Sequence, residues 1–312
     1  MKIKLLLILG MSLLLIACGD DRPERLQANV KSAEYLTANL GATLDTNGIR
    51  NATILREYAR LLSEDKPQLK PLLTELSRDA SRQGPIFQGL QSRLKTLQEQ
   101  PQVLGDIEAQ LFESENLIAA TDPLLFNDAL SDPINVIADM SDGKLARVNA
   151  ISKQQSLQAN SAQDHGAGSQ LVGNPGYGQW QTDNNGMSFW QWYGMYAMFS
   201  ALSPNRIRYD SWSSGRDYSY YNDVGRNRYT SPQQAKSQDN LATRSKKQFS
   251  SKGGFQSPYA KSKTGASSIS SASRQAQQTT SFAGKSNYSK TKSASSFRNS
   301  KTTTSRGISR GK

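Results

Sequence analysis

Residues 50–62 read RNATILREYARLL, and their apolar side chains recur every three or four positions. An α-helix has 3.6 residues per turn, so side chains at this spacing fall on one face of the helix. The pattern therefore predicts an amphipathic helix that buries one face. Its apolar positions are Ile54, Leu55, Tyr58, Leu61 and Leu62.

The same spacing extends through residues 24–151, with turn-forming pairs such as Asn47-Gly48 and Gly84-Pro85 between the apolar stripes. Short connections favour antiparallel neighbours. We therefore predict a mainly α fold, an antiparallel helical bundle of five to seven helices, with no strand in this span. The further stripes are Leu26, Val30, Ala33 and Leu40; Leu72, Leu73 and Leu76; Ile86, Leu90, Leu94 and Leu97; and Leu104, Ile107, Leu111 and Ile118.

Prolines indicate where some of these helices begin. Asp122-Pro123 and Asp132-Pro133 each place a carboxylate that could cap a helix before a proline that suits its first turn. We also expect a helix to begin near Lys70, with Pro71 in its first turn. The predicted role of the acidic residues in this region is therefore structural.

The composition changes after residue 151. Residues 152–173 are rich in Gln, Ser, Ala, Asn and Gly and lack apolar periodicity, so we predict a linker. Residues 174–230 form a small segment rich in Trp, Tyr and Arg. Its most apolar part, 187–202, fits a helix that docks on the bundle, a helix that lies on a membrane, or an aromatic platform for a sugar or a partner. Docking into the core is favoured, because buried aromatic residues usually pack.

The C-terminal segment 231–312 carries the positive charge of the chain. It has 11 Lys and 5 Arg against Asp239 alone, a net charge of +15, whereas the whole chain carries +12. Lys2 and Lys4 lie near the N-terminus, so residues 18–230 sum to −5. Ser, Thr, Gln, Gly and Lys dominate the segment, and we predict a disordered basic tail.

The N-terminus has the plan of a secretory signal peptide in residues 1–17: Lys2 and Lys4, a short apolar run, then small residues before Cys18. Leu15-Ile16-Ala17-Cys18 resembles the lipobox of bacterial lipoproteins. The resemblance implies cleavage before Cys18, the only cysteine, and acylation (palmitate or a similar chain) of that residue in a lipidated N-terminus, 18–23. It also implies a membrane anchor in the cell envelope. Gly19 after the cysteine favours the outer membrane over the inner membrane.

Candidate catalytic chemistry is sparse. His165, the only histidine, lies in the predicted linker, where we expect a solvated loop residue. A single histidine and a single cysteine exclude the common zinc sites. The sequence offers no phosphate loop, dinucleotide fingerprint or nucleophile elbow. We therefore predict no catalytic residue, no metal and no cofactor.

The candidate binding residues lie in the aromatic segment. They are Trp190, Trp192, Tyr193, Tyr196, Arg206 and Arg208. Arginines among tyrosines suit nucleic acid, but an exported protein rarely meets it. The nearby Asp210, Asp217 and Asp223 offer salt-bridge partners, so nucleic acid is not favoured.

The preferred hypothesis is a non-enzymatic lipoprotein that binds or tethers. Its partners would be the membrane through the lipid, anionic lipid, lipopolysaccharide or peptidoglycan through the basic tail, and a helical protein through the bundle. The alternative is an envelope enzyme or enzyme accessory whose site lies between the acidic helix ends and the aromatic block.

Overall fold

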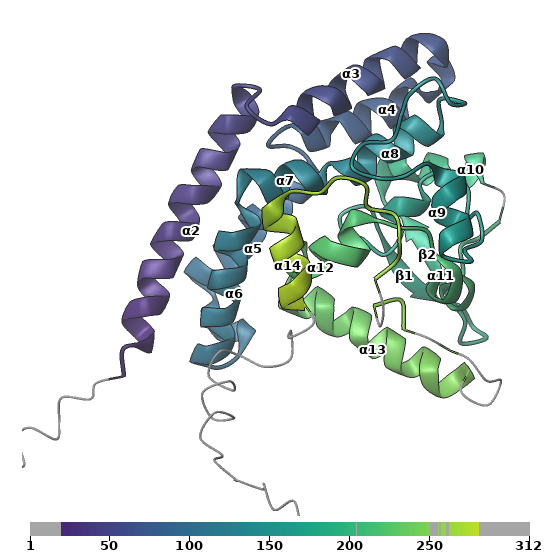
Figure 1. Ribbon diagram of the computed structural model, residues 1–312. Coiled ribbons are helices and arrows are strands. Elements are labelled where there is room, and N and C mark those ends of the chain that lie inside the picture. Colours follow the sequence, from purple (N-terminus) through teal and green to yellow (C-terminus); the bar gives the residue numbers. More distant parts are fainter. Residues whose placement is uncertain (1–19, 204, 250–254, 256, 260–261, 281–312) are drawn as a thin grey trace, which may run out of the picture.

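The computed structural model describes residues 20–203, 205–249, 255, 257–259 and 262–280. The described chain is mainly helical, with one small two-stranded sheet, as the sequence predicts for fold class (Figure 1). Within these ranges no helix combines the length and the apolar character needed to cross a membrane. Cys18 lies outside the described residues, as does the segment 281–312.

Seven α-helices occur between residues 22 and 139, a fully described stretch without strands. The helix expected near Lys70 begins there, and Pro71 lies in its first turn. The helices are α2 (Arg22–Asp45), α3 (Arg50–Asp65), α4 (Lys70–Ser77), α5 (Pro85–Glu99), α6 (Ile107–Ala120), α7 (Pro123–Ala129) and α8 (Ser131–Asp139). Three short 3-10 turns join them: η2 (Pro67–Leu69), η3 (Arg78–Ala80) and η4 (Pro101–Leu104).

Helices α2, α5 and α6 form one group that is only partly antiparallel (Figure 1). Helix α5 runs antiparallel to α6, and a short turn joins the two helices. Helix α2 runs in the same direction as α6, because Arg22 reaches Glu108 and Asn29 reaches Ser114. The long excursion through α3 and α4 separates α2 from α5 and allows this parallel contact.

The core lies where α3 and α4 meet each other and where α3 meets α8. Leu55 of α3, Leu72, Leu73 and Leu76 of α4, and Ile137 of α8 are buried. Burying a leucine or isoleucine side chain contributes about 1.5–3 kcal/mol relative to leaving it exposed. The predicted stripes thus supply the apolar faces that hold these helices together.

The two predicted caps have different outcomes. The Asp122 carboxylate accepts hydrogen bonds from the backbone N–H groups of Leu124 and Leu125, at 2.7 and 3.4 Å, so this cap is confirmed. The prediction for Asp132 is wrong, because α8 begins at Ser131 and Asp132 lies inside it. Its side chain is buried and bonds to a distant segment instead.

The predicted linker 152–173 is folded. It contains α9 (Lys153–Ala159) and η5 (Ser169–Leu171), and Leu171 and Val172 are fully buried. Its polar side chains reach distant residues, as when the Gln170 amide donates to Asp139 at 2.9 Å. Hydrogen bonds to remote segments hold this stretch, which is why apolar periodicity does not reveal it.

The aromatic segment is built from short pieces. Residues 187–202 do not form a single helix, so both helical interpretations of this stretch are wrong. Strands β1 and β2 pair antiparallel, with Trp180 opposite Trp190. The pieces are β1 (Gly178–Thr182), β2 (Ser188–Trp192), η6 (Gly194–Met198), α10 (Phe199–Leu202), α11 (Tyr209–Gly215), the π-helix η7 (Tyr221–Gly225) and α12 (Arg226–Tyr229).

Two helices lie in the segment predicted to be disordered. They are α13 (Pro232–Phe249) and α14 (Ser271–Thr280). Both pack against the rest of the protein, since Leu241 and Ala242 of α13 and Ala276 of α14 are buried. The prediction of disorder is therefore wrong for these two helices.

Candidate functional site

All four tryptophans of the chain belong to one aromatic cluster, defined here as Trp180, Trp190, Trp192, Tyr209 and Trp212. The ring centre of Trp180 lies 5.2 Å from that of Trp190, 4.8 Å from that of Tyr209 and 5.1 Å from that of Trp212. Such edge-to-face and tilted contacts add about 0.5–1.5 kcal/mol per pair beyond burial. The cluster belongs to the protein's own core, the interpretation that the sequence favours.

The predicted binding residues do not come together in one site. Trp190, Trp192 and Tyr196 are buried, with exposed fractions of 5%, 9% and 4%. Tyr193, Arg206 and Arg208 are exposed. The Arg206 guanidinium lies 4.7 Å from the centre of the Phe189 ring, and Arg208 pairs with Asp210 at 3.6 Å.

His165 is buried, which corrects the expectation of a solvated loop residue. The Ser203 hydroxyl donates a hydrogen bond to the backbone carbonyl of His165 at 3.2 Å. Gly166 and Gly168 have positive φ and approach Ser203 and Phe199 closely, so the loop folds onto α10. Burial lowers the pKa of the His165 imidazole, with Asp164 opposing that shift.

Asp128 and Asp132 each accept hydrogen bonds from the start of a distant helical segment. Asp132 accepts from the backbone N–H groups of Tyr220 and Tyr221, at 2.7 and 2.8 Å, and so caps the helical segment that starts there. Asp128 accepts from the Ser270 N–H at 2.8 Å and the Ser273 hydroxyl at 2.7 Å, at the start of α14. These two carboxylates cap segments far away in the sequence.

In the part of the chain that the structure describes, buried ion pairs form around three arginine side chains. Arg216 contacts both carboxylate oxygens of Asp223, at 2.9 and 2.6 Å. Arg147 bridges Asp139 and Asp217 at 2.7 and 3.0 Å. The third arginine, Arg93 of α5, pairs with Glu113 of α6 and so joins these two helices. The sequence correctly offers Asp217 and Asp223 as salt-bridge partners.

Asp79 is a fully buried carboxyl that sequence reasoning missed. It accepts a hydrogen bond from the Tyr177 hydroxyl and lies 3.5 Å from the Ile86 N–H. Burial raises the pKa of Asp79 to about 7, and it does the same for Asp132, with the hydrogen bonds to each opposing the shift. Both side chains are therefore protonated well above the ordinary carboxyl range.

We expect the Asp79→Asn variant to have a flatter stability profile between about pH 4 and pH 7. In this window the folded wild type keeps the Asp79 proton, whereas the unfolded chain, with its ordinary pKa of 3.8, has lost it. The free energy of unfolding therefore falls as the pH rises, by at most about 1.4 kcal/mol per pH unit for this group. Urea unfolding at a series of pH values measures the slope.

The variant comparison isolates Asp79 from two other contributions. His165, with its lowered pKa, loses stability as the pH falls below its ordinary 6.5, but it does so in both proteins. Asp132 titrates in the same direction as Asp79 and also remains in both. Parallel profiles for the wild type and Asp79→Asn would contradict the assignment.

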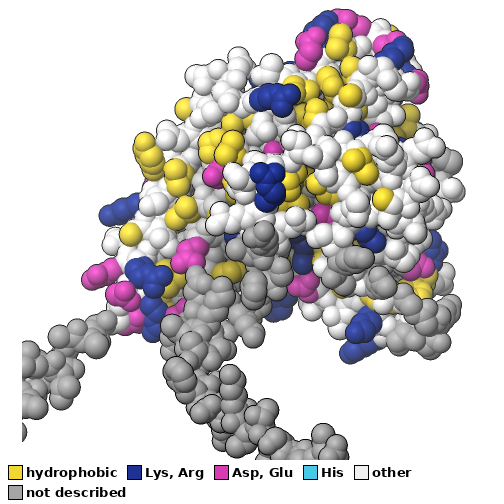
Figure 2. All heavy atoms as spheres, viewed as in Figure 1, with side chains coloured by type: hydrophobic (Ala, Val, Ile, Leu, Met, Phe, Trp, Pro, Cys, Tyr) yellow, Lys and Arg dark blue, Asp and Glu magenta, His cyan; other side chains and the backbone are white. Residues whose placement is uncertain are grey.

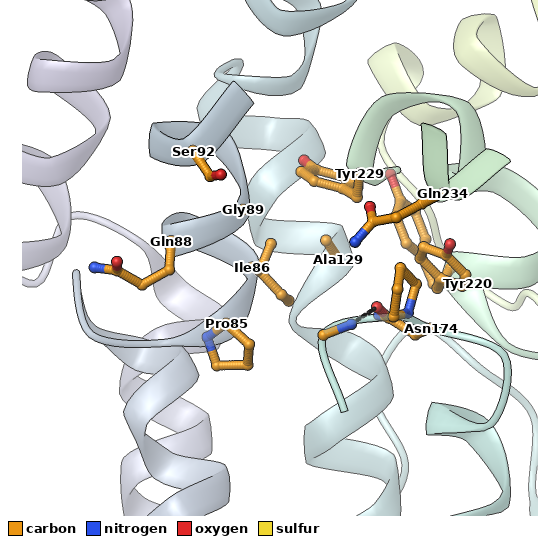
Figure 3. A pocket seen from close by; sticks show the side chains of 13 residues that line it. Pro85, Ile86, Gln88, Gly89, Ser92, Ala129, Asn174, Tyr220, Tyr229 and Gln234 are labelled. Atoms are coloured by element: carbon orange, nitrogen blue, oxygen red, sulfur yellow. Dashed lines mark hydrogen bonds between the residues drawn. The ribbon is translucent and has the colours of Figure 1, made fainter. Parts of the chain in front are cut away.

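A cavity of about 310 Å³ lies between α5 and the chain from residue 220 to 234 (Figure 3). Figure 3 shows Pro85, Gln88 and Ser92 of α5 on one side and Tyr229 and Gln234 on the other. Among the described residues, no charged side chain lines it. The lining residues are Pro85, Ile86, Gln88, Gly89, Ser92, Ala129, Asn174, Pro175, Gly176, Tyr220, Tyr221, Tyr229 and Gln234.

Gly89 lines the cavity and is exposed. This residue lies inside α5, where glycine costs about 0.5–1 kcal/mol relative to alanine. A Cβ atom built at Gly89 would have no heavy atom within 4 Å outside the helix's own backbone. The glycine therefore leaves open space where other residues would place a side chain.

Sequence reasoning missed this cavity, because its lining comes from five separate parts of the chain. The one local signal is a glycine within the apolar stripe of residues 86–97. Comparison with known proteins found no matching family model, no similar curated protein and no similar solved structure.

Proposed function

We propose that this chain is an envelope lipoprotein that tethers anionic envelope material without catalysing a reaction. Acyl chains on Cys18 would hold one end in a membrane, with the outer membrane favoured. The basic C-terminal segment would bind anionic lipid, lipopolysaccharide or peptidoglycan. The mainly helical domain between them would set the distance and orientation of the two.

The observation that carries the proposal is the position of the two chain ends. Helix α2 begins at Arg22, and α14 ends at Thr280, both toward the lower side of the molecule in Figure 1. Helix α13 runs along this side, and its Lys236, Arg244 and Lys246 are exposed. An anchor and a basic segment that leave from one side suit a protein that works next to a membrane surface.

The charge distribution supports the same arrangement. Residues 281–312 contain eight Lys and Arg and no Asp or Glu, whereas residues 18–230 carry −5. Near an anionic surface each basic side chain contributes about 1 kcal/mol at moderate salt. Eight such charges favour association with anionic polymers and lipids.

The surface where α2 begins has both signs of charge (Figure 2). Arg22 contacts Asp20 and Glu108, at 2.6 and 3.0 Å, and Arg25 contacts Glu115 at 3.6 Å. Because these charges balance locally, this end of the domain has no excess positive charge for an anionic surface. We therefore propose that α13 and the C-terminal segment provide the attraction to an anionic surface.

The acidic residues support a non-enzymatic role. The oxygens of Asp128, Asp132 and Asp223 accept hydrogen bonds from backbone and side-chain donors of the protein itself. A carboxylate held in this way stabilises the fold and is not directed at a substrate. We therefore favour binding over catalysis as the activity of this chain.

The anchor is tested by replacing Cys18 with serine. Wild-type protein expressed in a Gram-negative host should incorporate radiolabelled palmitate and fractionate with membranes. The Cys18→Ser variant should lose the label and move to the soluble fraction. Equal labelling of the two proteins would disprove lipidation at Cys18.

The tethering role is tested with a chain that ends at Thr280. On vesicles that contain anionic lipid, at low salt, its affinity should be at least about a hundredfold weaker than that of the full chain, because eight basic side chains are lost. A full-length control with those eight residues replaced by glutamine should behave like the truncation. Binding to purely zwitterionic vesicles should not change, and equal affinities on anionic vesicles would contradict the proposal.

A further inference from the structure

We propose that the cavity between α5 and the tyrosines of residues 220–229 binds a single neutral sugar ring. This inference is independent of the lipid anchor and of the basic segment. It rests on four features of the cavity: the fixed tyrosine rings, the neutral polar groups beside them, two unusual local features of the chain that lines it, and its size.

The hydroxyl groups of all three tyrosines are engaged elsewhere, and the partly exposed Tyr229 offers its ring, whereas Tyr220 and Tyr221 are 0% and 3% exposed. The Tyr220 hydroxyl lies 2.8 Å from the Ser273 hydroxyl, and the Tyr229 hydroxyl donates to the Ala120 carbonyl at 3.1 Å. The Tyr221 hydroxyl accepts from the Gln238 amide at 3.0 Å. Rigid aromatic carbon surface of this kind suits the C–H face of a pyranose ring.

Two neutral amides provide polar groups beside these rings. The Gln234 side-chain oxygen accepts from the Ser231 N–H at 3.0 Å, so its NH₂ group is the end left to donate. Figure 3 shows this side chain extending toward Ala129. The Asn174 side-chain oxygen accepts from the Gly176 N–H at 3.0 Å, which leaves its NH₂ group as a donor too. Sugar hydroxyl and acetamido oxygens are suitable acceptors for these donors.

The neutral lining also excludes other ligand classes. A phosphate or carboxylate would lose its hydration without meeting a positive side chain, which is strongly unfavourable. A purely apolar ligand would leave the two amides without partners. A neutral ring with one apolar face and several hydroxyl groups matches both the aromatic part and the amide groups of the cavity lining.

The chain that lines the cavity has two unusual local features, a glycine within a regular α-helix and a π-helix. On the α5 side, Gly89 leaves space that alanine would partly fill. On the opposite side, Tyr221 begins the π-helix η7, and such single turns are rare and often occur at functional sites. Both features lie at the same cavity, since Gly89 and Tyr221 are among its lining residues.

The volume fits one ring. Small-molecule sites in proteins usually start at about 300 Å³, and this cavity of about 310 Å³ lies at that lower limit. We therefore infer a terminal or single sugar and not an oligosaccharide buried along its length. Glucose and N-acetylglucosamine are the two probes of matching size and neutral charge.

The test is a ligand-observed NMR titration of the full-length protein with four sugars. Glucose or N-acetylglucosamine should bind, and the charged analogues glucuronate and glucosamine should bind at least tenfold more weakly. Gly89→Leu, which places a side chain in the cavity, should weaken binding of the neutral sugar at least tenfold. Gly89→Ala, which adds a single methyl group, should retain binding.

A matched control separates filling of the cavity from general damage. Gln98→Leu adds the same side chain at an exposed position of α5 outside the cavity, and its affinity should equal that of the wild type. Thermal unfolding should show that each variant is folded. The proposal is overturned if neither neutral sugar binds, if glucuronate or glucosamine binds as tightly, or if folded Gly89→Leu binds as well as Gln98→Leu.

Discussion

Replacing Arg216 by methionine should lower the free energy of unfolding by about 3–5 kcal/mol, because the change leaves a buried carboxylate without its positive partner. Arg216 is 1% exposed, and its guanidinium contacts both oxygens of Asp223 and the Pro258 carbonyl. Methionine fills much of the same space, so the effect should report the lost charge and hydrogen bonds. Urea unfolding followed by circular dichroism measures it.

The control for this variant is Arg208→Met, at an exposed arginine on the same segment. Arg208 pairs with Asp210 at 3.6 Å, and exposed pairs of this kind contribute less than about 1 kcal/mol. The two substitutions remove the same side chain, so their difference isolates burial. If both variants unfold at the same urea concentration, the buried pair does not have the importance assigned to it.

A chain that ends at Thr230 should lose cooperative unfolding, whereas a chain that ends at Thr280 should stay within about 0.5 kcal/mol of the full protein. The shorter chain lacks α13 and α14 and exposes the core that Leu241 helps to cover. Asp128 also loses its bonds to Ser270 and Ser273, and Asp223 loses the Lys263 N–H. Asp223 keeps Arg216 and Asp128 keeps the Asn149 amide, but each lost hydrogen bond to these buried carboxylates costs about 1–3 kcal/mol.

Thermal melts monitored in the near ultraviolet compare the two truncations, because the buried tryptophans report tertiary packing. The chain that ends at Thr280 is the control for removing basic charge, since it loses residues 281–312 and keeps both helices. A cooperative melt at the wild-type temperature for the chain that ends at Thr230 would show that α13 and α14 are dispensable.

Most helices of residues 22–139 could be predicted because they have an apolar stripe or a recognisable start, whereas the start of α8 was predicted wrongly. Leu72, Leu73 and Leu76 are buried as their spacing indicates, and α4 begins at Lys70 because Pro71 suits a first turn. Relative direction was harder to predict. The parallel contact of α2 with α6 depends on where α3 and α4 turn, which no local pattern specifies.

The missed elements are those whose burial depends on polar contacts. In α13 the buried positions Gln238, Leu241, Ala242 and Ser245 have helical spacing, but two of the four are polar, so the pattern resembles a solvated tail. The strand β2 had a clearer signal, because Trp190 and Trp192 are buried on either side of exposed Gln191. That alternation at a period of two indicates a strand.

The candidate binding residues share a chemical type, aromatic or basic, and type alone does not determine exposure. Trp190 and Trp192 look like a binding platform in the sequence, yet contact with Trp180 and Phe199 places them in the core. The cavity, by contrast, is lined by tyrosines, amides and a glycine from segments up to about 150 positions apart. Only the folded chain brings these residues together.

The distant caps also determine the order in which this protein can fold. Asp128 accepts a hydrogen bond from the start of α14, 142 residues further along the chain. Asp132 accepts one from Tyr220, 88 residues further along. Contacts between residues so far apart close large loops and slow folding. During synthesis α7 and α8 are made long before α14 and Tyr220. The carboxylates of Asp128 and Asp132 therefore lack these hydrogen-bond donors until the later part of the chain has been made. The last described helix thus completes the domain, and native structure is reached only after most of the chain has been made.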